Sequence, residues 1–260
     1  WGFLSALSQE YLTDGSVQGQ ATAQTYREAA DLLLNTTNTE NILDDIWQKQ
    51  YSIIANVNLI LKHIDEPDYN AFAFGEDERT LIKGEALALR AILHFDLLRL
   101  FAPAPVTKPT GTYLPYRTEF NSEVGEKLTV NAFLENVIKD LKDARPLIEK
   151  FDTETHPQAM YAYMMSSNDP HWNARYRFDS KTYIDEMGEF FWSRGWRINA
   201  MAVIGLQARV YMYAGSAYHS LAKACAVELY NTYYKSWLII CLIINHLGIF
   251  STIIVEEACC

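Results

Sequence analysis

The chain has 260 residues, of which 49% are hydrophobic and 21% are charged. This balance excludes a disordered or collagen-like chain, and the length suffices for a large buried core. The chain has 22 Lys and Arg against 32 Asp and Glu, so its formal charge is −10. A protein that binds nucleic acid through its phosphates normally has the opposite balance, so that class of partner is excluded.

Helix signals begin at Thr25 and continue for most of the chain. Thr25 and Glu28 have the spacing of a capping box, which predicts a short helix to about residue 35. A longer amphipathic helix is expected over residues 41–63, with Asn41 as its cap. A second long helix is expected over residues 76–101, because a proline-rich stretch directly after it prevents continuation.

The pattern changes after this helix. Residues 102–127 are expected to form a loop with extended stretches around Val106 and Leu114. Thr129 is then the predicted cap of a third helix, whose apolar side chains lie on one side as far as Leu147.

A helical hairpin is predicted towards the end of the chain. Asn199 starts a helix that runs through Tyr213 and is closed by Gly215, and residues 217–230 form its partner. Small residues recur where the two helices must approach closely, as in tetratricopeptide hairpins, although no strict period can be traced. We therefore predict a mainly all-α fold of tetratricopeptide-like helical hairpins.

Residues 151–197 interrupt the helical pattern. This stretch contains eleven aromatic residues, and its periodicity is poor. Loops of this length inside a compact domain are usually functional or disordered, and the aromatic content argues against disorder. We predict a long aromatic-rich loop insertion within the helical scaffold.

The insertion is also the candidate ligand site. Aromatic rings pack on the apolar face of a pyranose, while carboxylates and arginines bind its hydroxyls. The predicted contacts are Trp172, Trp192, Trp196, Asp185 and Arg194. Two other interpretations stay open. The carboxylates of this stretch, Glu189 among them, could serve a glycosidase, or the aromatic residues could simply form the core of the insertion.

No catalytic residue, cofactor or metal site is predicted. The chain lacks a phosphate-binding glycine loop, a nucleophile elbow and an H-E-x-x-H sequence. His94 is expected to be a packed or capping histidine. The alternating Asp152, Glu154 and His156 are interpreted as a solvated polar loop rather than metal ligands. All four cysteines lie in the last 36 residues, and none is expected to be a ligand or a nucleophile.

Two parts of the chain are distinguished by composition. Residues 1–235 form the predicted scaffold, and residues 236–260 form an atypical hydrophobic tail. Within the tail, residues 237–255 carry no charge. A membrane span, two buried strands, a packed hydrophobic helix and a non-native end all remain open for this run.

Four segments in order resemble the SusD/RagB family. They are IWQKQYSIIANVNLILKHID (46–65), KGEALALRAILHFDLLRLFAPAPV (83–106), LTVNAFLENVIKDLKDARPLI (128–148) and RINAMAVIGLQARVYMYAG (197–215). The second is the most recognisable, with Gly-Glu-Ala, then Leu-Arg-Ala and a proline-containing exit. Family members are much longer, so the chain resembles their N-terminal portion.

The resemblance implies a surface lipoprotein of the Bacteroidetes outer membrane. Such a protein binds a glycan or another nutrient and delivers it to a SusC-like TonB-dependent transporter. The resemblance further implies a binding protein rather than an enzyme, without cofactors, and held at the membrane by a lipid anchor missing from this chain. The family's ligand residues vary, so none is transferred. The alternative function is a helical-repeat interaction scaffold without a small-molecule ligand.

Overall fold

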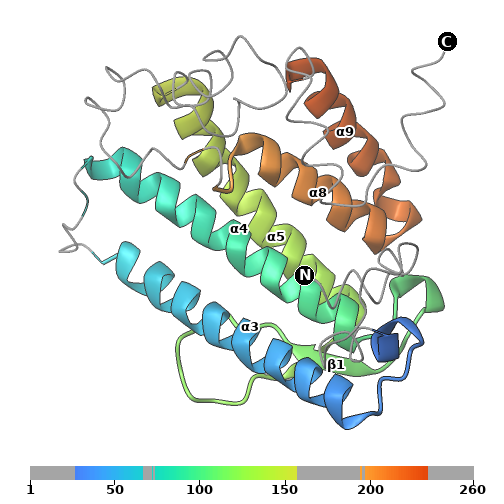
Figure 1. Ribbon diagram of the computed structural model, residues 1–260. Helices are drawn as coiled ribbons and strands as arrows, with labels where there is room; N and C mark the ends of the chain where they lie inside the picture. The colour runs from blue at the N-terminus through green and yellow to red at the C-terminus, as the bar shows by residue number, and fades with distance from the viewer. Residues whose placement is uncertain (1–26, 67–71, 73, 157–193, 195–196, 234–260) are drawn as a thin grey trace, which may run out of the picture. The chain divides into compact units, whose positions relative to one another are not determined.

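The computed structural model describes residues 27–66, 72, 74–156, 194 and 197–233 (Figure 1). Helices dominate this part of the chain, as predicted. The α-helices are α3 (Thr37–Ile64), α4 (Gly75–Phe101), α5 (Val130–Glu149), α8 (Ala200–Ala214) and α9 (His219–Tyr233). Two short strands, β1 (Thr112–Pro115) and β2 (Lys127–Thr129), pair antiparallel. The chain divides into two compact units, residues 1–53 and 54–260, which are described separately.

In the first unit, the start of α3 differs from the prediction. Among the described residues, the preceding helix ends at Ala30 and does not reach residue 35, because Leu32 has a left-handed backbone with φ 58°. Thr36, and not Asn41, caps α3: its hydroxyl accepts a hydrogen bond from the Thr39 amide at 3.3 Å. The predicted start was therefore four residues too late.

In the second unit, consecutive helices pack side by side. α4 packs on α5, α5 on α8 and α8 on α9 (Figure 1). The helices bury apolar side chains between them; fully buried examples are Leu81, Leu97, Phe133, Leu141, Val203 and Ile204. α8 and α9 form the predicted hairpin. Gly215 in the turn between them has φ 106°, a backbone conformation that residues with a Cβ rarely adopt.

The predicted caps of α5 and α8 are confirmed. The Thr129 hydroxyl accepts a hydrogen bond from the Ala132 amide at 3.3 Å, and the Asn199 side chain accepts one from the Ala202 amide at 2.9 Å. In the connection between α4 and α5, Leu114 lies on β1 and is fully buried, as expected for an extended segment.

The expectation for Val106 was wrong. Val106 lies in a single 3-10 turn, η1 (Pro105–Thr107), and is 84% exposed. Pro105 at the start of the turn fixes a φ that suits the turn, and Lys108 follows in a left-handed conformation, which ends it.

The start of the predicted insertion continues the scaffold. α5 leads directly into a π-helical turn, η2 (Lys150–Thr155), in which Phe151 and Asp152 are buried. The remainder of the insertion at 157–193 and the tail at 236–260 lie outside the described residues. Within the described helices, none is both long enough and apolar enough to cross a membrane.

α4 and α5 approach closely at Gly84. A Cβ at this position would lie 2.8 Å from Ile148 Cγ1 and 3.0 Å from Leu147 Cβ, which is closer than packed atoms allow.

We therefore expect Gly84→Val to lower the free energy of unfolding by about 1–3 kcal/mol. Urea unfolding followed by circular dichroism measures this. Ala224→Val on the exposed side of α9 is the control, with an expected change of about 0.5 kcal/mol or less. Equal effects of the two substitutions would contradict the close packing.

Candidate functional site

Of the five predicted ligand contacts, the structure describes one. Trp172, Asp185, Trp192 and Trp196 lie outside the described residues, so their role stays a prediction. Arg194 is described, and it is only 1% exposed.

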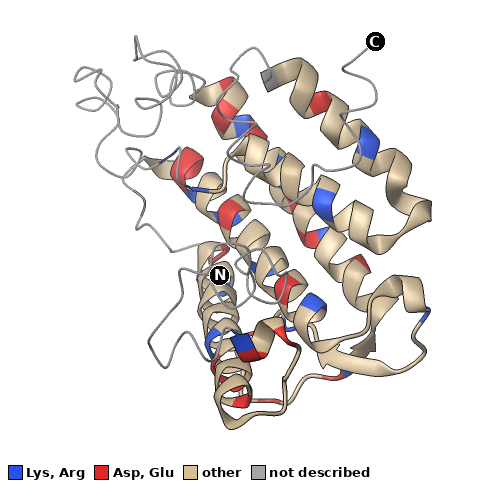
Figure 2. Ribbon diagram, turned by 45° about the vertical axis from the view of Figure 1, so that its right-hand side comes forward, with Lys and Arg blue, Asp and Glu red and all other residues tan. Residues whose placement is uncertain are grey.

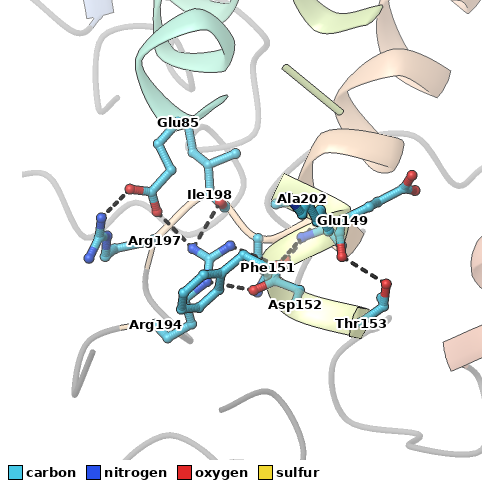
Figure 3. Close-up of polar contacts among 12 residues, drawn as sticks. Glu85, Glu149, Phe151, Asp152, Thr153, Arg194, Arg197, Ile198 and Ala202 are labelled. Carbon is cyan, nitrogen blue, oxygen red and sulfur yellow. Dashed lines mark hydrogen bonds and ion pairs between the residues drawn. The ribbon is translucent and has the colours of Figure 1, made fainter. Parts of the chain in front are cut away.

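Arg194 is held by two acidic side chains (Figure 3). Its Nε and Nη2 atoms donate to the two carboxylate oxygens of Asp152, each at 2.7 Å. Its Nη1 atom donates to Glu85 Oε1 at 2.7 Å and to the Ile198 carbonyl oxygen at 3.1 Å. Because the bidentate pair satisfies both oxygens of Asp152, this is the strong form of an arginine–carboxylate contact.

The same two acids bind other groups nearby. Asp152 also accepts a hydrogen bond from the Ala200 amide at 2.8 Å, in the first turn of α8, where a negative charge is favoured. Glu85 also pairs with Arg197. Burial raises the pKa of Glu85, and the charges of Arg194 and Arg197 oppose that shift. We call these four charged residues, Glu85, Asp152, Arg194 and Arg197, the basal ion cluster.

The basal ion cluster joins the two sides of the predicted insertion. Asp152 precedes residues 157–193, Arg194 follows them, and Glu85 connects both to α4. Its two acids and two arginines balance in charge. The Nε, Nη1 and Nη2 atoms of Arg194 all donate hydrogen bonds within the protein. The predicted contact of Arg194 with a ligand stays a prediction. The expectation that Asp152 is solvated was wrong, since it is 1% exposed.

The last residue of that pattern, His156, contacts the start of α4. His156 Nε2 lies 3.3 Å from Asp77 Oδ2, on the first turn of α4. Among the residues that the structure describes, no group of three or more histidine, cysteine or acidic side chains could hold a metal ion.

A second buried polar network connects α3, α4, α5 and the strand exit. Arg90 donates to both carboxylate oxygens of Asp140, from Nε at 2.7 Å and from Nη2 at 2.8 Å, and from Nη1 to Asn58 Oδ1 at 3.0 Å. The Tyr116 hydroxyl donates to Asp140 at 2.6 Å. Asn58 in turn donates to the Arg117 carbonyl oxygen at 3.1 Å. This network ties the connecting segment after β1 to three helices.

His94 belongs to the same region and is a packed histidine, as expected. It is fully buried and stacks on Tyr116 with ring centroids 3.9 Å apart. Its Nδ1 atom lies 2.9 Å from the Arg90 carbonyl oxygen, and its Nε2 atom accepts a hydrogen bond from the Arg117 amide at 3.0 Å. An Nε2 that accepts this bond carries no proton. Burial lowers the pKa of His94 to about 3, in agreement with a neutral ring.

The low pKa of His94 predicts a pH dependence of stability. The folded form does not bind the proton that the unfolded form binds below its usual pKa of about 6.5, so stability falls as the pH drops below that value. The expected slope is about 0.7 kcal/mol per pH unit at pH 6.5, where half of the unfolded chains carry the proton, and it rises to about 1.4 kcal/mol per pH unit near pH 5. Urea unfolding of the native chain and of His94→Gln over this range measures it. The slope should largely disappear in His94→Gln and persist in the exposed-site control His63→Gln. An unchanged slope in His94→Gln would contradict the assignment.

Charges elsewhere on the described helices are mixed. Figure 2 shows acidic and basic residues interspersed along the helices, without separation into a basic face in that view.

Comparison with known protein families shows which family the chain belongs to. The family described as "Starch-binding associating with outer membrane", SusD-like, matches residues 4–168. The chain belongs to the SusD-like family. The predicted SusD/RagB membership is thereby confirmed. No curated protein sequence matches the chain.

A solved structure also resembles this SusD-like chain. It is a SusD-like carbohydrate binding protein from Bacteroides vulgatus ATCC 8482, with a TM-score of 0.53 and 18% sequence identity. The match covers 89% of this chain and 44% of the other, so the chain spans less than half the length of that protein. At this identity the likeness supports the fold.

The recognisable SusD-like stretch has a structural role in this chain. Its Gly84 allows α4 and α5 to approach, its Glu85 belongs to the basal ion cluster, and its Arg90 binds Asp140. Glu85 was not among the predicted site residues. Its place beside Gly84 in the most recognisable segment was the one signal that could have pointed to it.

Proposed function

We propose that this SusD-like chain is the glycan-binding component of an outer-membrane nutrient-uptake system. It binds oligosaccharide at the cell surface and delivers it to a SusC-like TonB-dependent transporter, held at the membrane by a lipid anchor. The observation that carries the proposal is the family match over residues 4–168, because that family is described by starch binding and outer-membrane association.

The aromatic-rich insertion supports the proposal. Its tryptophans are suited to pack on pyranose rings, and acidic side chains beside them are suited to bind hydroxyls. The basal ion cluster holds the two ends of the insertion close together, since Asp152 before residues 157–193 forms an ion pair with Arg194 after them. Binding without chemistry is the proposed activity, so the chain is not proposed to be a glycosidase.

Tryptophan fluorescence during oligosaccharide titration tests the proposal. We expect a saturable change with at least one glycan of a diverse set. Substitution of Trp192 or Trp196 by alanine should weaken binding by about tenfold, the effect of losing a well-packed aromatic contact. Trp47→Ala in α3, outside the insertion, is the matched control and should leave the affinity unchanged. No response to any glycan, or equal losses in all three variants, would count against the proposal.

The alternative function, an interaction scaffold, is favoured by one observation. Leu221, Val227 and Tyr230 on α9 are each more than 40% exposed. Val227 and Tyr230 are three positions apart and so lie on one face of α9, and neighbouring exposed apolar side chains are typical of a surface that another protein covers. Replacing Val227 and Tyr230 by serine should abolish capture of a purified partner under this alternative, and should leave glycan binding unchanged under the main proposal.

A further inference from the structure

The loop between β1 and β2, residues 116–126, has no regular secondary structure, yet its start is firmly anchored. The buried Asn58 on α3 donates to the carbonyl oxygen of Arg117 at 3.1 Å and to that of Glu119 at 3.4 Å. The buried His94 on α4 accepts a hydrogen bond from the Arg117 amide at 3.0 Å. Two helices of the scaffold therefore fix the backbone where the loop begins. We call residues 116–126 the stapled loop.

The side chain of Arg117 fixes the rest of the stapled loop. Its Nη2 atom donates to the Asn121 carbonyl oxygen at 3.1 Å and also to Asn121 Oδ1, and its Nη1 atom donates to the Glu123 carbonyl oxygen. The loop returns against its own start at Gly125, where a Cβ would lie 2.9 Å from Pro115 Cβ and 3.0 Å from Arg117 Cδ. The guanidinium thus holds the far side of the loop to its beginning.

The stapled loop exposes two apolar side chains on this fixed backbone. Val124 is 97% exposed and Phe120 is 48% exposed. Single exposed apolar residues are common, but two within five positions of a fixed loop form a small preorganised surface. A loop that is already ordered loses little conformational entropy on binding, and loops held by a rigid scaffold often carry binding residues.

Negative charge surrounds the two apolar side chains. The stapled loop contains one arginine and three glutamates, so its formal charge is −2. All three glutamates are exposed. The Glu119 carboxylate accepts a hydrogen bond from the Asn121 side chain, whereas those of Glu123 and Glu126 form no ion pair within the described part of the chain. Since Arg117 donates to carbonyl oxygens, these acids are available to basic groups of a partner.

This combination favours a protein partner over other occupants. A lipid surface would bring the three carboxylates against its anionic headgroups, and a symmetric contact between two copies of the loop would bring like charges together. A pyranose would meet one aromatic ring, because Val124 has no flat face. An apolar pocket bordered by lysine or arginine side chains complements both the apolar centre and the acidic edge.

We propose that the stapled loop is a docking site for a protein partner that receives Phe120 and Val124 in an apolar pocket bordered by basic side chains. The site lies on the scaffold and contains none of the predicted glycan contacts. The inference rests on the proposed function for the identity of the partner, since a SusC-like transporter is the protein partner proposed there.

Surface plasmon resonance with the immobilised full chain and the purified SusC-like transporter from the same organism tests the docking site. Phe120→Ser with Val124→Ser should weaken the affinity about a hundredfold, the loss expected when two apolar side chains no longer become buried. Both side chains are exposed in the free chain, so the thermal midpoint should not change. Val106→Ser is the matched control, because it replaces an 84% exposed valine of η1, outside the stapled loop, and should leave the affinity unchanged.

Charge reversal tests the acidic edge separately. Glu123→Lys with Glu126→Lys should weaken binding about tenfold or more at low ionic strength, and the difference from the native chain should shrink as salt is added. If either double variant binds the transporter as the native chain does, or if Val106→Ser loses as much affinity as the double serine variant, the inference is overturned.

Two further measurements decide between occupants. The native chain should not float with vesicles of phosphatidylethanolamine and phosphatidylglycerol, and it should sediment as a monomer. Flotation or self-association that the double serine variant abolishes would assign the loop to lipid or to a second copy of the chain, and would overturn the inference.

The outcome is separable from that of the proposed function. A native chain that binds a glycan, but whose affinity for the transporter is unaffected by the double serine variant, would overturn the docking site alone. A native chain that binds a glycan but not the transporter would overturn the docking site and the delivery step together. An absence of glycan binding would overturn the proposed glycan-binding role, while the transporter titration would still decide the stapled loop.

Discussion

Replacing Arg194 with leucine is expected to lower the free energy of unfolding by about 3–5 kcal/mol. Asp152 and Glu85 would lose their shared cation, and Asp152 would remain almost fully buried with a negative charge. An uncompensated buried charge is more costly than the ion pair is favourable, so the loss far exceeds that of an exposed pair.

Urea unfolding followed by circular dichroism measures the effect of Arg194→Leu. Lys139→Leu is the control, because it removes the same charge from an ion pair in which the lysine is 70% exposed. The expected change for the control is about 0.5 kcal/mol or less. A loss for Arg194→Leu that matches the control would show that the basal ion cluster does not hold the scaffold.

The second large effect is expected at Asp140. Asp140→Ala would leave the Arg90 guanidinium without its carboxylate and the Tyr116 hydroxyl without its acceptor, both in buried surroundings. We expect a loss of about 3–5 kcal/mol. Asp143→Ala, one turn further along α5, removes a 48% exposed carboxylate and should change stability by about 0.5 kcal/mol or less.

A double variant separates the cost of a lone charge from the value of the pair. Arg90→Leu combined with Asp140→Leu removes both charges, so it should recover a large part of the stability lost in Asp140→Ala. If the double variant is no more stable than Asp140→Ala, the loss would have to be attributed to Asn58, Tyr116 and the shape of the site rather than to a buried charge.

Local signals account for the parts of the fold that could be predicted. The three-and-four spacing of apolar residues predicted α4 and α5, and the side chains of Thr129 and Asn199 marked the first turns of α5 and α8. These features depend on neighbours within one or two turns, which a single sequence displays directly. The start of α3 was misplaced because Thr36 and Asn41 are both acceptable caps, and the left-handed Leu32 has no marker in the sequence.

Contacts between distant residues could not be predicted. Asp152 and Arg194 are 42 positions apart, and Arg90 and Asp140 are 50 positions apart. The sequence pattern predicts that Asp152 is solvated and that Arg194 contacts a ligand, since charged residues outside regular helices are usually exposed. It does not indicate that the two side chains pair with each other. Their pairing depends on how η2 lies against the start of α8, which only the three-dimensional arrangement supplies.

The candidate site also has one part that the sequence indicates and one part that it does not. Aromatic content indicated the insertion as the place for a ligand, and that part of the prediction concerns residues outside the described ranges. The burial of Asp96 had no signal in the sequence, because this residue lies in a well-patterned helix where charged residues normally face solvent.

Calorimetric titration of the chain with starch-derived oligosaccharides, beside a set of unrelated glycans, tests the central claim most directly. The account predicts saturable binding with one-to-one stoichiometry for at least one glycan, weakened in Trp192→Ala and unchanged in Trp47→Ala. A cooperatively folded chain that releases or takes up no heat with any glycan in the set would contradict a glycan-binding role.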